Sequence, residues 1–147
     1  MTDIKSETVG HEEHGYVPAG EPFHDIRFRV TIDASLKIHE AHASIDASPF
    51  DVCPHISEAY SKLIGIHIGP GWRVKAKQLV GGASGCTHIN ELFPVIATTA
   101  FQAMWSHSDE ATKKQGFKLM LDKCHAWSQD GKLAGKLFSE DDLKAKD

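Results

Sequence analysis

The chain has 147 residues, 41% of them apolar, and a formal net charge of −4 with neutral histidines; this length fits one globular domain with a sizeable core. The acidic balance argues against a nucleic-acid surface, and no apolar run approaches the ~20 residues that span a bilayer. The first residues lack a signal-peptide pattern, so we expect a cytoplasmic protein.

The first half of the chain predicts a small antiparallel sheet. Residues 1–18 are polar and rich in turn formers, and we expect a flexible N-terminal segment there. From Ile26 to Ile32 apolar and polar residues alternate, which is typical of a strand with one wet face. Turn residues at 33–35 and a weaker alternation over 37–45 predict a hairpin, and the weakness allows a bulge.

Two helices are predicted next, from the spacing of apolar residues and from the proline and glycine residues at the helix ends. Apolar residues from 56 to 64 recur at helical intervals, and Gly65 provides a left-handed cap. Pro54 suits the first helical position, which makes Cys53 the predicted N-cap. A shorter helix over residues 72–80 should end at the glycine pair that follows.

The longest helix is expected at about 88–106, with Thr87 as its N-cap and a kink near Pro94. Residues 106–116 are predicted to form a connecting loop, and 139–147 a frayed tail. The expected fold class is therefore α+β: a small antiparallel sheet, formed by the N-terminal hairpin, packed against three or more helices. We expect a single domain over residues 19–138.

The three cysteines each have a histidine within two positions: Cys53 with His55, Cys86 with His88, and Cys124 with His125. Three cysteines cannot all pair within the chain, and a cytosolic compartment keeps thiols reduced. Cys53 and Cys86 each open a predicted helix, where the partial positive charge stabilises a thiolate. The alternative is that both are small buried residues.

Sulfur and imidazole together are ligands for one zinc or iron ion. We expect this ion on Cys53, Cys86 and His88, with His24 as a further ligand. His24, Asp46 and His88 are the candidate catalytic residues, although an aspartate such as Asp46 commonly caps a turn. A cysteine–histidine nucleophile pair is the other chemistry that these residues allow.

A series of motifs follows in order along the chain. They occupy residues 19–25 (AGEPFHD), 46–50 (DASPF), 53–54 (CP), 68–72 (IGPGW), 85–92 (GCTHINEL), 97–102 (ATTAFQ) and 122–126 (DKCHA). Together they resemble a bacterial family known as domain of unknown function 2889, over roughly residues 17–130. The family's name implies no settled activity.

The predicted layout also resembles the scaffold proteins of iron–sulfur cluster assembly. A hairpin is followed by a cysteine that opens a helix, and later by a cysteine that opens the last long helix. This resemblance implies that Cys53 and Cys86 hold zinc or a nascent cluster, with His88 or Asp46 completing the set. At the place of an early cysteine in those proteins, this chain has His24 and Asp25.

From these features we expect a small metal-dependent enzyme of the lyase, decarboxylase or hydrolase type. Its substrate would be a small organic acid, aromatic acids included, in a pocket walled by Phe23, Phe50, Trp72 and Phe93. A metal or iron–sulfur carrier, or a structural subunit of a larger enzyme, is the alternative. The expected partner is a small molecule, without nucleic acid or membrane, and a homodimer is left open.

Overall fold

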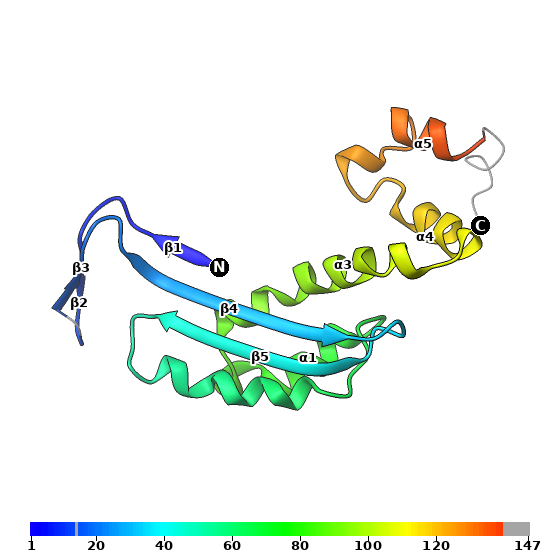
Figure 1. Ribbon diagram of the computed structural model, residues 1–147. Helices are drawn as coiled ribbons and strands as arrows, with labels where there is room; N and C mark the ends of the chain where they lie inside the picture. Colours follow the sequence, from blue (N-terminus) through cyan, green and yellow to red (C-terminus); the bar gives the residue numbers. More distant parts are fainter. Residues whose placement is uncertain (14, 140–147) are drawn as a thin grey trace. The chain divides into compact units, whose positions relative to one another are not determined.

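A computed structural model describes residues 1–13 and 15–139 of the chain (Figure 1). It confirms the α+β class, with a three-stranded antiparallel sheet, a two-stranded sheet and several helices. The described residues form two compact units, Met1–Met104 and a second unit that begins at Trp105. The single domain over 19–138 stays a prediction. Except for Ser139, the predicted tail lies outside the described residues.

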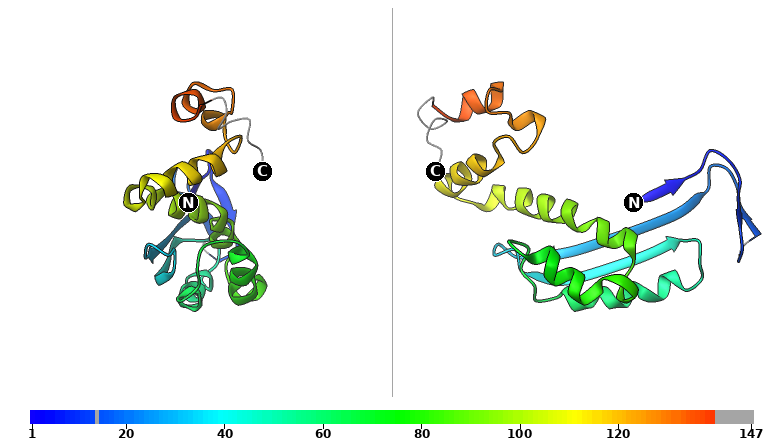
Figure 2. Two further views of the ribbon diagram at one scale, coloured as in Figure 1. Left: turned by 90° about the vertical axis from the view of Figure 1, so that its right-hand side faces the viewer. Right: turned by 180° about the vertical axis from the view of Figure 1, so that it is seen from behind.

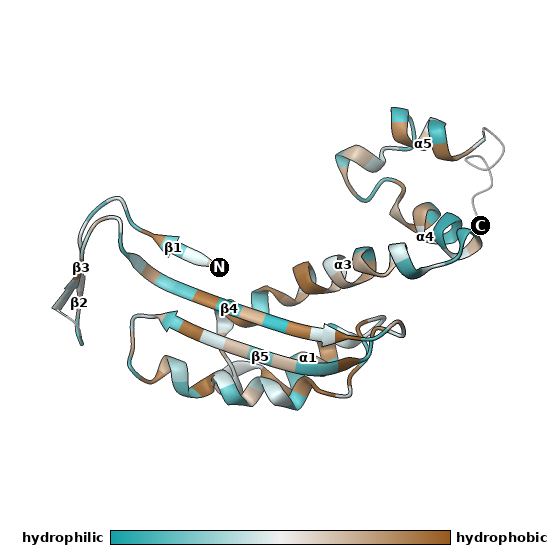
Figure 3. Ribbon diagram, in the orientation of Figure 1, coloured by the Kyte–Doolittle hydropathy of each residue, from teal (hydrophilic) through white to brown (hydrophobic). Residues whose placement is uncertain are grey.

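The main sheet of the first unit is built on the predicted hairpin. β4 (Pro22–Ile32) and β5 (Ile38–Ala47) pair antiparallel, and β1 (Thr2–Ile4) pairs with the other edge of β4. Figure 3 shows apolar and polar residues alternating along β4, which gives the sheet one apolar face. Two register shifts interrupt the β4–β5 pairing, at 25/26 and 31/32, so the expected irregularity is present.

Residues 1–18, predicted to be flexible, contain three short strands. β2 (Val9–His11) and β3 (Gly15–Val17) form the two-stranded sheet, and β1 joins the main sheet. The pairing partner of β1 lies about twenty residues away in the chain. Local composition does not reveal such a partner, which is why the sequence pattern missed this strand.

The helix after the hairpin is η1 (Cys53–Leu63), and it is a 3₁₀-helix rather than an α-helix. With three residues per turn, Tyr60 and Leu63 share one inward stripe, and both are fully buried. Ile64, predicted to point inward, lies just past the helix and is 50% exposed. Val52, not Cys53, is the N-cap.

The remaining helices of the first unit are α1 (Trp72–Val80), η2 (Gly82–Ser84), α2 (Thr87–Glu91) and α3 (Phe93–Ala103). α1 contacts η1, and the two lie side by side in Figure 2. The predicted helix over 88–106 is divided at Leu92, where Pro94 enters the first turn of α3. Cys86, not Thr87, is the N-cap of α2.

The core of the first unit lies between the apolar face of the sheet and these helices. Ile26 and Ile38 from the strands are buried together with Tyr60, Trp72 and Phe93 from the helices. The rings of Trp72 and Phe93 are 5.1 Å apart, which is within the range of a favourable aromatic contact. Ile89 of α2 is buried in the same core, and α2 contacts β4, so the start of α2 lies against the sheet.

The second unit contains η3 (Trp105–His107), α4 (Glu110–Met120), η4 (His125–Trp127) and α5 (Lys132–Leu137). The prediction of a connecting loop over 106–116 is wrong, because α4 occupies much of this range. Asp109 caps this helix by accepting a hydrogen bond from the Thr112 N–H at 2.7 Å. In the part of the chain that the structure describes, no helix is long and apolar enough to cross a membrane.

Gly85 provides a test of the packing at the start of α2. A Cβ at Gly85 would lie 1.9 Å from the carbonyl oxygen of Val80, whereas one at Gly69 would meet nothing within 4 Å. Gly85→Ala should therefore lower the free energy of unfolding by about 1–3 kcal/mol or more, and Gly69→Ala should change it by less than about 1 kcal/mol. Urea denaturation measures both, and equal effects would contradict this packing.

Candidate functional site

A cavity of about 410 Å³ opens in the first unit beside the start of α2. Four residues that the sequence singled out line it: His24, Cys53, Cys86 and His88. They come from β4, from the first position of η1 and from the beginning of α2. The fold therefore gathers these side chains from distant parts of the chain.

The rest of the cavity wall is mostly apolar. Ile26 and Ile45 face it from the sheet, and Ile56 faces it from η1. Phe50 and Val52, in the loop before η1, also line it and are 47% and 67% exposed. A cavity of this size with apolar walls and a few polar groups suits a small organic molecule.

Of the four aromatic residues expected to wall the pocket, only Phe50 lines the cavity. Trp72 and Phe93 are buried in the core instead. Phe23 lies next to His24 on β4, with ring centroids 5.2 Å apart, and is not a lining residue. The helical spacing of Trp72 and Phe93 indicates burial but not whether they face the core or the cavity.

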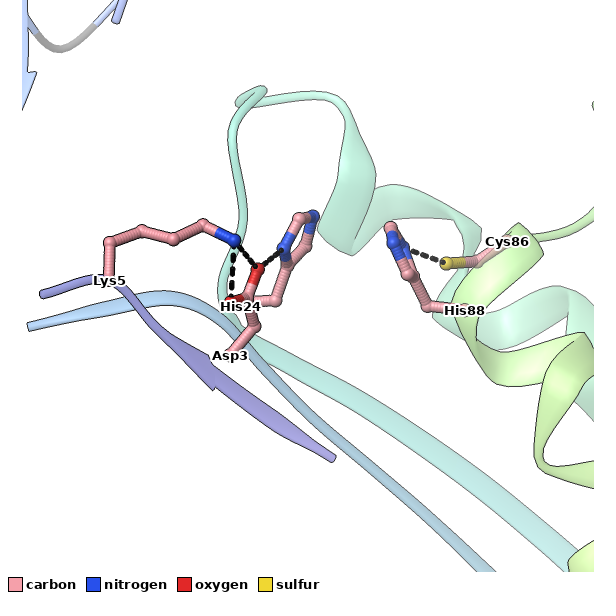
Figure 4. Close-up of polar contacts among 5 residues, drawn as sticks. All are labelled: Asp3, Lys5, His24, Cys86 and His88. Carbon is pink, nitrogen blue, oxygen red and sulfur yellow. Dashed lines mark hydrogen bonds and ion pairs between the residues drawn. The ribbon is translucent and has the colours of Figure 1, made fainter. Parts of the chain in front are cut away.

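Cys86 and His88 form the closest sulfur–imidazole contact of the cavity. The Sγ atom of Cys86 lies 3.9 Å from Nδ1 of His88 (Figure 4). Burial lowers the pKa of His88, the nearby charge of His24 lowers it further, and Asp3 partly offsets both. The lowered pKa favours the neutral form of His88, which can accept a proton.

His24 contacts Asp3, which is itself bound by Lys5, and the sequence pattern indicated neither of these two residues. Nδ1 of His24 lies 3.2 Å from Oδ2 of Asp3, and Nζ of Lys5 lies 2.8 and 2.9 Å from the two carboxylate oxygens. These hydrogen bonds, from Lys5 first and then His24, lower the pKa of Asp3. Only the pairing of β1 with β4 places Asp3 opposite His24, and no local sequence pattern signals this pairing.

The two imidazole rings lie close together. The ring centroids of His24 and His88 are 4.3 Å apart, with a 49° angle between the ring planes. Figure 4 shows Lys5, Asp3, His24, His88 and Cys86 as one row that runs from the β1 segment to α2. Polar groups from three separate segments thus meet at one end of the cavity.

Asp46, a predicted catalytic residue, lies away from this row. Its carboxylate contacts Nη1 of Arg27 at 3.2 Å, its side chain is 47% exposed, and it is not among the cavity-lining residues. Asp25 contacts the same guanidinium at 3.3 Å. The alternation of β5 turns Asp46 toward the polar face of the sheet.

The potential metal ligands share the cavity without converging on one point. Among residues 1–13 and 15–139, no three His, Cys, Asp or Glu side chains are grouped as a metal ion requires. Nδ1 of His88 faces Cys86, whereas Nδ1 of His24 faces Asp3. One zinc or iron ion would require these rings to turn.

Tyr60 fixes the backbone of Cys86 from within the core. Its hydroxyl accepts a hydrogen bond from the Cys86 N–H at 2.8 Å, and it lies 3.1 Å from the Cys86 carbonyl oxygen and 3.0 Å from Oδ1 of Asn90. The Asn90 amide in turn donates to the carbonyl of Val80 at 2.8 Å. Burial raises the pKa of Tyr60 to about 12, so this hydroxyl keeps its proton.

The sequence model of the family described as "Protein of unknown function (DUF2889)" matches residues 1–102. The chain belongs to this family. The matched span contains every residue that lines the cavity, and it ends two residues before the end of the first unit. No curated protein and no solved structure matches the chain.

The site of this DUF2889 protein thus lies within the family's domain, whereas Cys124 and His125 lie in the second unit. Cys124 is exposed, and Cys53 and Cys86 are half-buried. Although all three cysteines have a neighbouring histidine, only Cys53 and Cys86 line the cavity.

Tyr60→Phe tests the support of Cys86. The variant leaves the Cys86 N–H and the Asn90 oxygen without this partner, so we expect a loss of about 1–3 kcal/mol in the free energy of unfolding. The same change at Tyr16, which is 65% exposed, should cost little. Because the pKa of Tyr60 is raised from 10.0 to about 12, its contribution is complete below pH 10 and is lost as pH rises through 12. Equal losses in the two variants would contradict this role.

Proposed function

We propose that the cavity is the active site of a small hydrolase that cleaves an activated derivative of a small organic acid, with Cys86 as nucleophile and His88 as general base. One observation carries the proposal: the Cys86 sulfur lies 3.9 Å from the His88 ring nitrogen inside a cavity of suitable size. Such nucleophile–base distances are often loose before substrate binds. The neutral state of His88 fits the role of base.

In this reaction Nδ1 of His88 takes the thiol proton of Cys86, and the Sγ atom bonds to the carbonyl carbon of the substrate. The bond to the leaving group breaks, and His88 returns its proton to that group. Water then hydrolyses the acylated cysteine and releases the acid. The hydrogen bond from the Cys86 N–H to Tyr60 holds the backbone of Cys86 through both steps.

The walls of the cavity indicate the substrate class. Ile26, Ile45 and Ile56 provide an apolar floor, and Phe50 lies at the exposed rim. These surfaces suit an aliphatic or aromatic acyl group rather than a sugar or a nucleotide. We therefore expect activated esters or thioesters of small acids as substrates.

Alkylation by iodoacetamide at neutral pH tests the cysteine–histidine pair. We expect Cys86 to react faster than Cys124, although Cys124 is the more exposed of the two. His88→Gln removes the base and should slow alkylation of Cys86 by about tenfold or more, without changing the rate at Cys124. Peptide mass spectrometry separates the two rates. If Cys86 reacts more slowly than Cys124, or if His88→Gln has no effect, the pair is not activated.

Metal-dependent catalysis is the second candidate, because all four predicted ligands line the same cavity. His24, Cys53, Cys86 and His88 would hold one zinc or iron ion after their rings and thiols reorient. Such an ion would polarise a carbonyl or activate water. The same residues would serve a metal or iron–sulfur carrier.

Elemental analysis after purification without chelators separates these candidates. The thiol mechanism predicts less than about 0.1 equivalent of zinc or iron per chain, in both the wild type and Cys86→Ser. Close to one equivalent that Cys86→Ser loses would favour the metal enzyme, and visible absorption of a cluster would favour the carrier. A chain with neither metal nor a reactive Cys86 would fit a structural subunit.

A further inference from the structure

His24 lines the cavity, and its contact with Asp3 is a polar interaction that the Cys86–His88 pair does not use. The side chain of His24 is 12% exposed and that of Asp3 is 31% exposed. Lys5 donates hydrogen bonds to both carboxylate oxygens of Asp3. The Lys5 ammonium also lies 5.7 Å from the ring centre of Phe23. Lys5 therefore holds the carboxylate of Asp3 while the same carboxylate contacts His24.

The geometry determines which nitrogen of His24 carries the proton in its neutral form. An ionised carboxylate can only accept hydrogen bonds, so the Nδ1 that faces Asp3 must be the N–H. The second ring nitrogen, Nε2, is then a bare acceptor. Asp3 thus selects one tautomer of His24 and one ring orientation, as carboxylates commonly do for functional histidines.

We propose that Asp3 is a positioning residue that holds His24 as a second proton acceptor of the cavity, serving the hydrolysis of the acylated Cys86. This inference rests on the proposed function. Of the two imidazoles in the cavity wall, whose ring centres lie 4.3 Å apart, His24 is the one in contact with a carboxylate, which favours proton acceptance at its free nitrogen. The two histidines then divide the reaction: His88 serves acylation and His24 serves deacylation.

The step balances without any additional reagent. Nε2 of His24 takes a proton from water as the water oxygen bonds to the acyl carbon. The bond between that carbon and Sγ of Cys86 breaks, the acid leaves, and the proton on His24 returns to the thiolate. Asp3 keeps its negative charge throughout and stabilises the transient imidazolium.

Nitrogen-15 NMR of the histidine side chains tests the positioning claim independently of activity. At a pH where His24 is neutral, the wild type should show His24 with the proton on Nδ1. Asp3→Asn replaces the acceptor by an amide that can both donate and accept, so the single tautomer should be lost. Lys5→Gln keeps the carboxylate and should retain the wild-type tautomer. An unchanged tautomer in Asp3→Asn would overturn the claim.

The kinetics of para-nitrophenyl acetate hydrolysis test the catalytic part. In Asp3→Asn we expect the initial burst, which reports acylation of Cys86, to persist with its amplitude unchanged. The steady-state rate, which reports deacylation, should fall by about tenfold or more. Asp130→Asn, the same change at an exposed residue of the second unit, should alter neither phase. A structural defect would instead lower both phases together.

If the wild type hydrolyses the ester no faster than Cys86→Ser does, Cys86 is not the nucleophile, and the deacylation role of His24 is lost with it; the NMR result still decides whether Asp3 positions His24. If the burst is present and the tautomer changes but the steady-state rate does not, Asp3 orients His24 without serving catalysis. That outcome would also overturn the deacylation role.

Discussion

The arrangement of the site depends on the hydroxyl of Tyr60. This buried group joins η1 to the segment that carries Cys86, because it accepts the Cys86 N–H and lies within hydrogen-bond distance of Asn90. Asn90 extends the connection to the end of α1 through Val80. A buried polar network of this kind is stabilising only when each of its members is paired. It therefore restricts the turn before α2 to one conformation, and Gly85 gives that turn the space it needs.

The cavity is assembled from segments that are far apart in the chain. β4 contributes His24, the loop and first turn of η1 contribute Phe50 and Cys53, and the start of α2 contributes Cys86 and His88. β1 adds Asp3 behind His24. Every one of these residues lies within the span that matches the DUF2889 family, so the family domain contains a complete candidate site.

The elements with strong local patterns were predictable from the sequence. Alternation predicted the β4–β5 hairpin, and glycine punctuation predicted the end of α1. The nature of η1 was missed, because its stripe at Tyr60 and Leu63 fits both 3.0 and 3.6 residues per turn. α4 was missed because its start lies in a charged stretch, although Asp109 followed by Glu110 is an N-terminal signal.

For the candidate site, the sequence predicted which residues take part but not how their side chains are oriented. Cysteine–histidine spacing indicated Cys86 and His88, but it says nothing about the direction in which each ring nitrogen points. Asp3 could not be predicted from the sequence, because only the long-range pairing of β1 with β4 brings it to His24. Asp46 resembled a site residue in the sequence, and its contact with Arg27 on the polar face of the sheet places it outside the cavity.

The central claim is that Cys86 is a nucleophile activated within this cavity. Intact-mass spectrometry of the full chain, quenched in acid shortly after mixing with para-nitrophenyl acetate, tests it most directly. A nucleophilic Cys86 should give a chain with a single acetyl group, which maps to the peptide of Cys86 and is absent in Cys86→Ser. An unmodified chain, or acetylation that maps to Cys124 or to lysines alone, would contradict it.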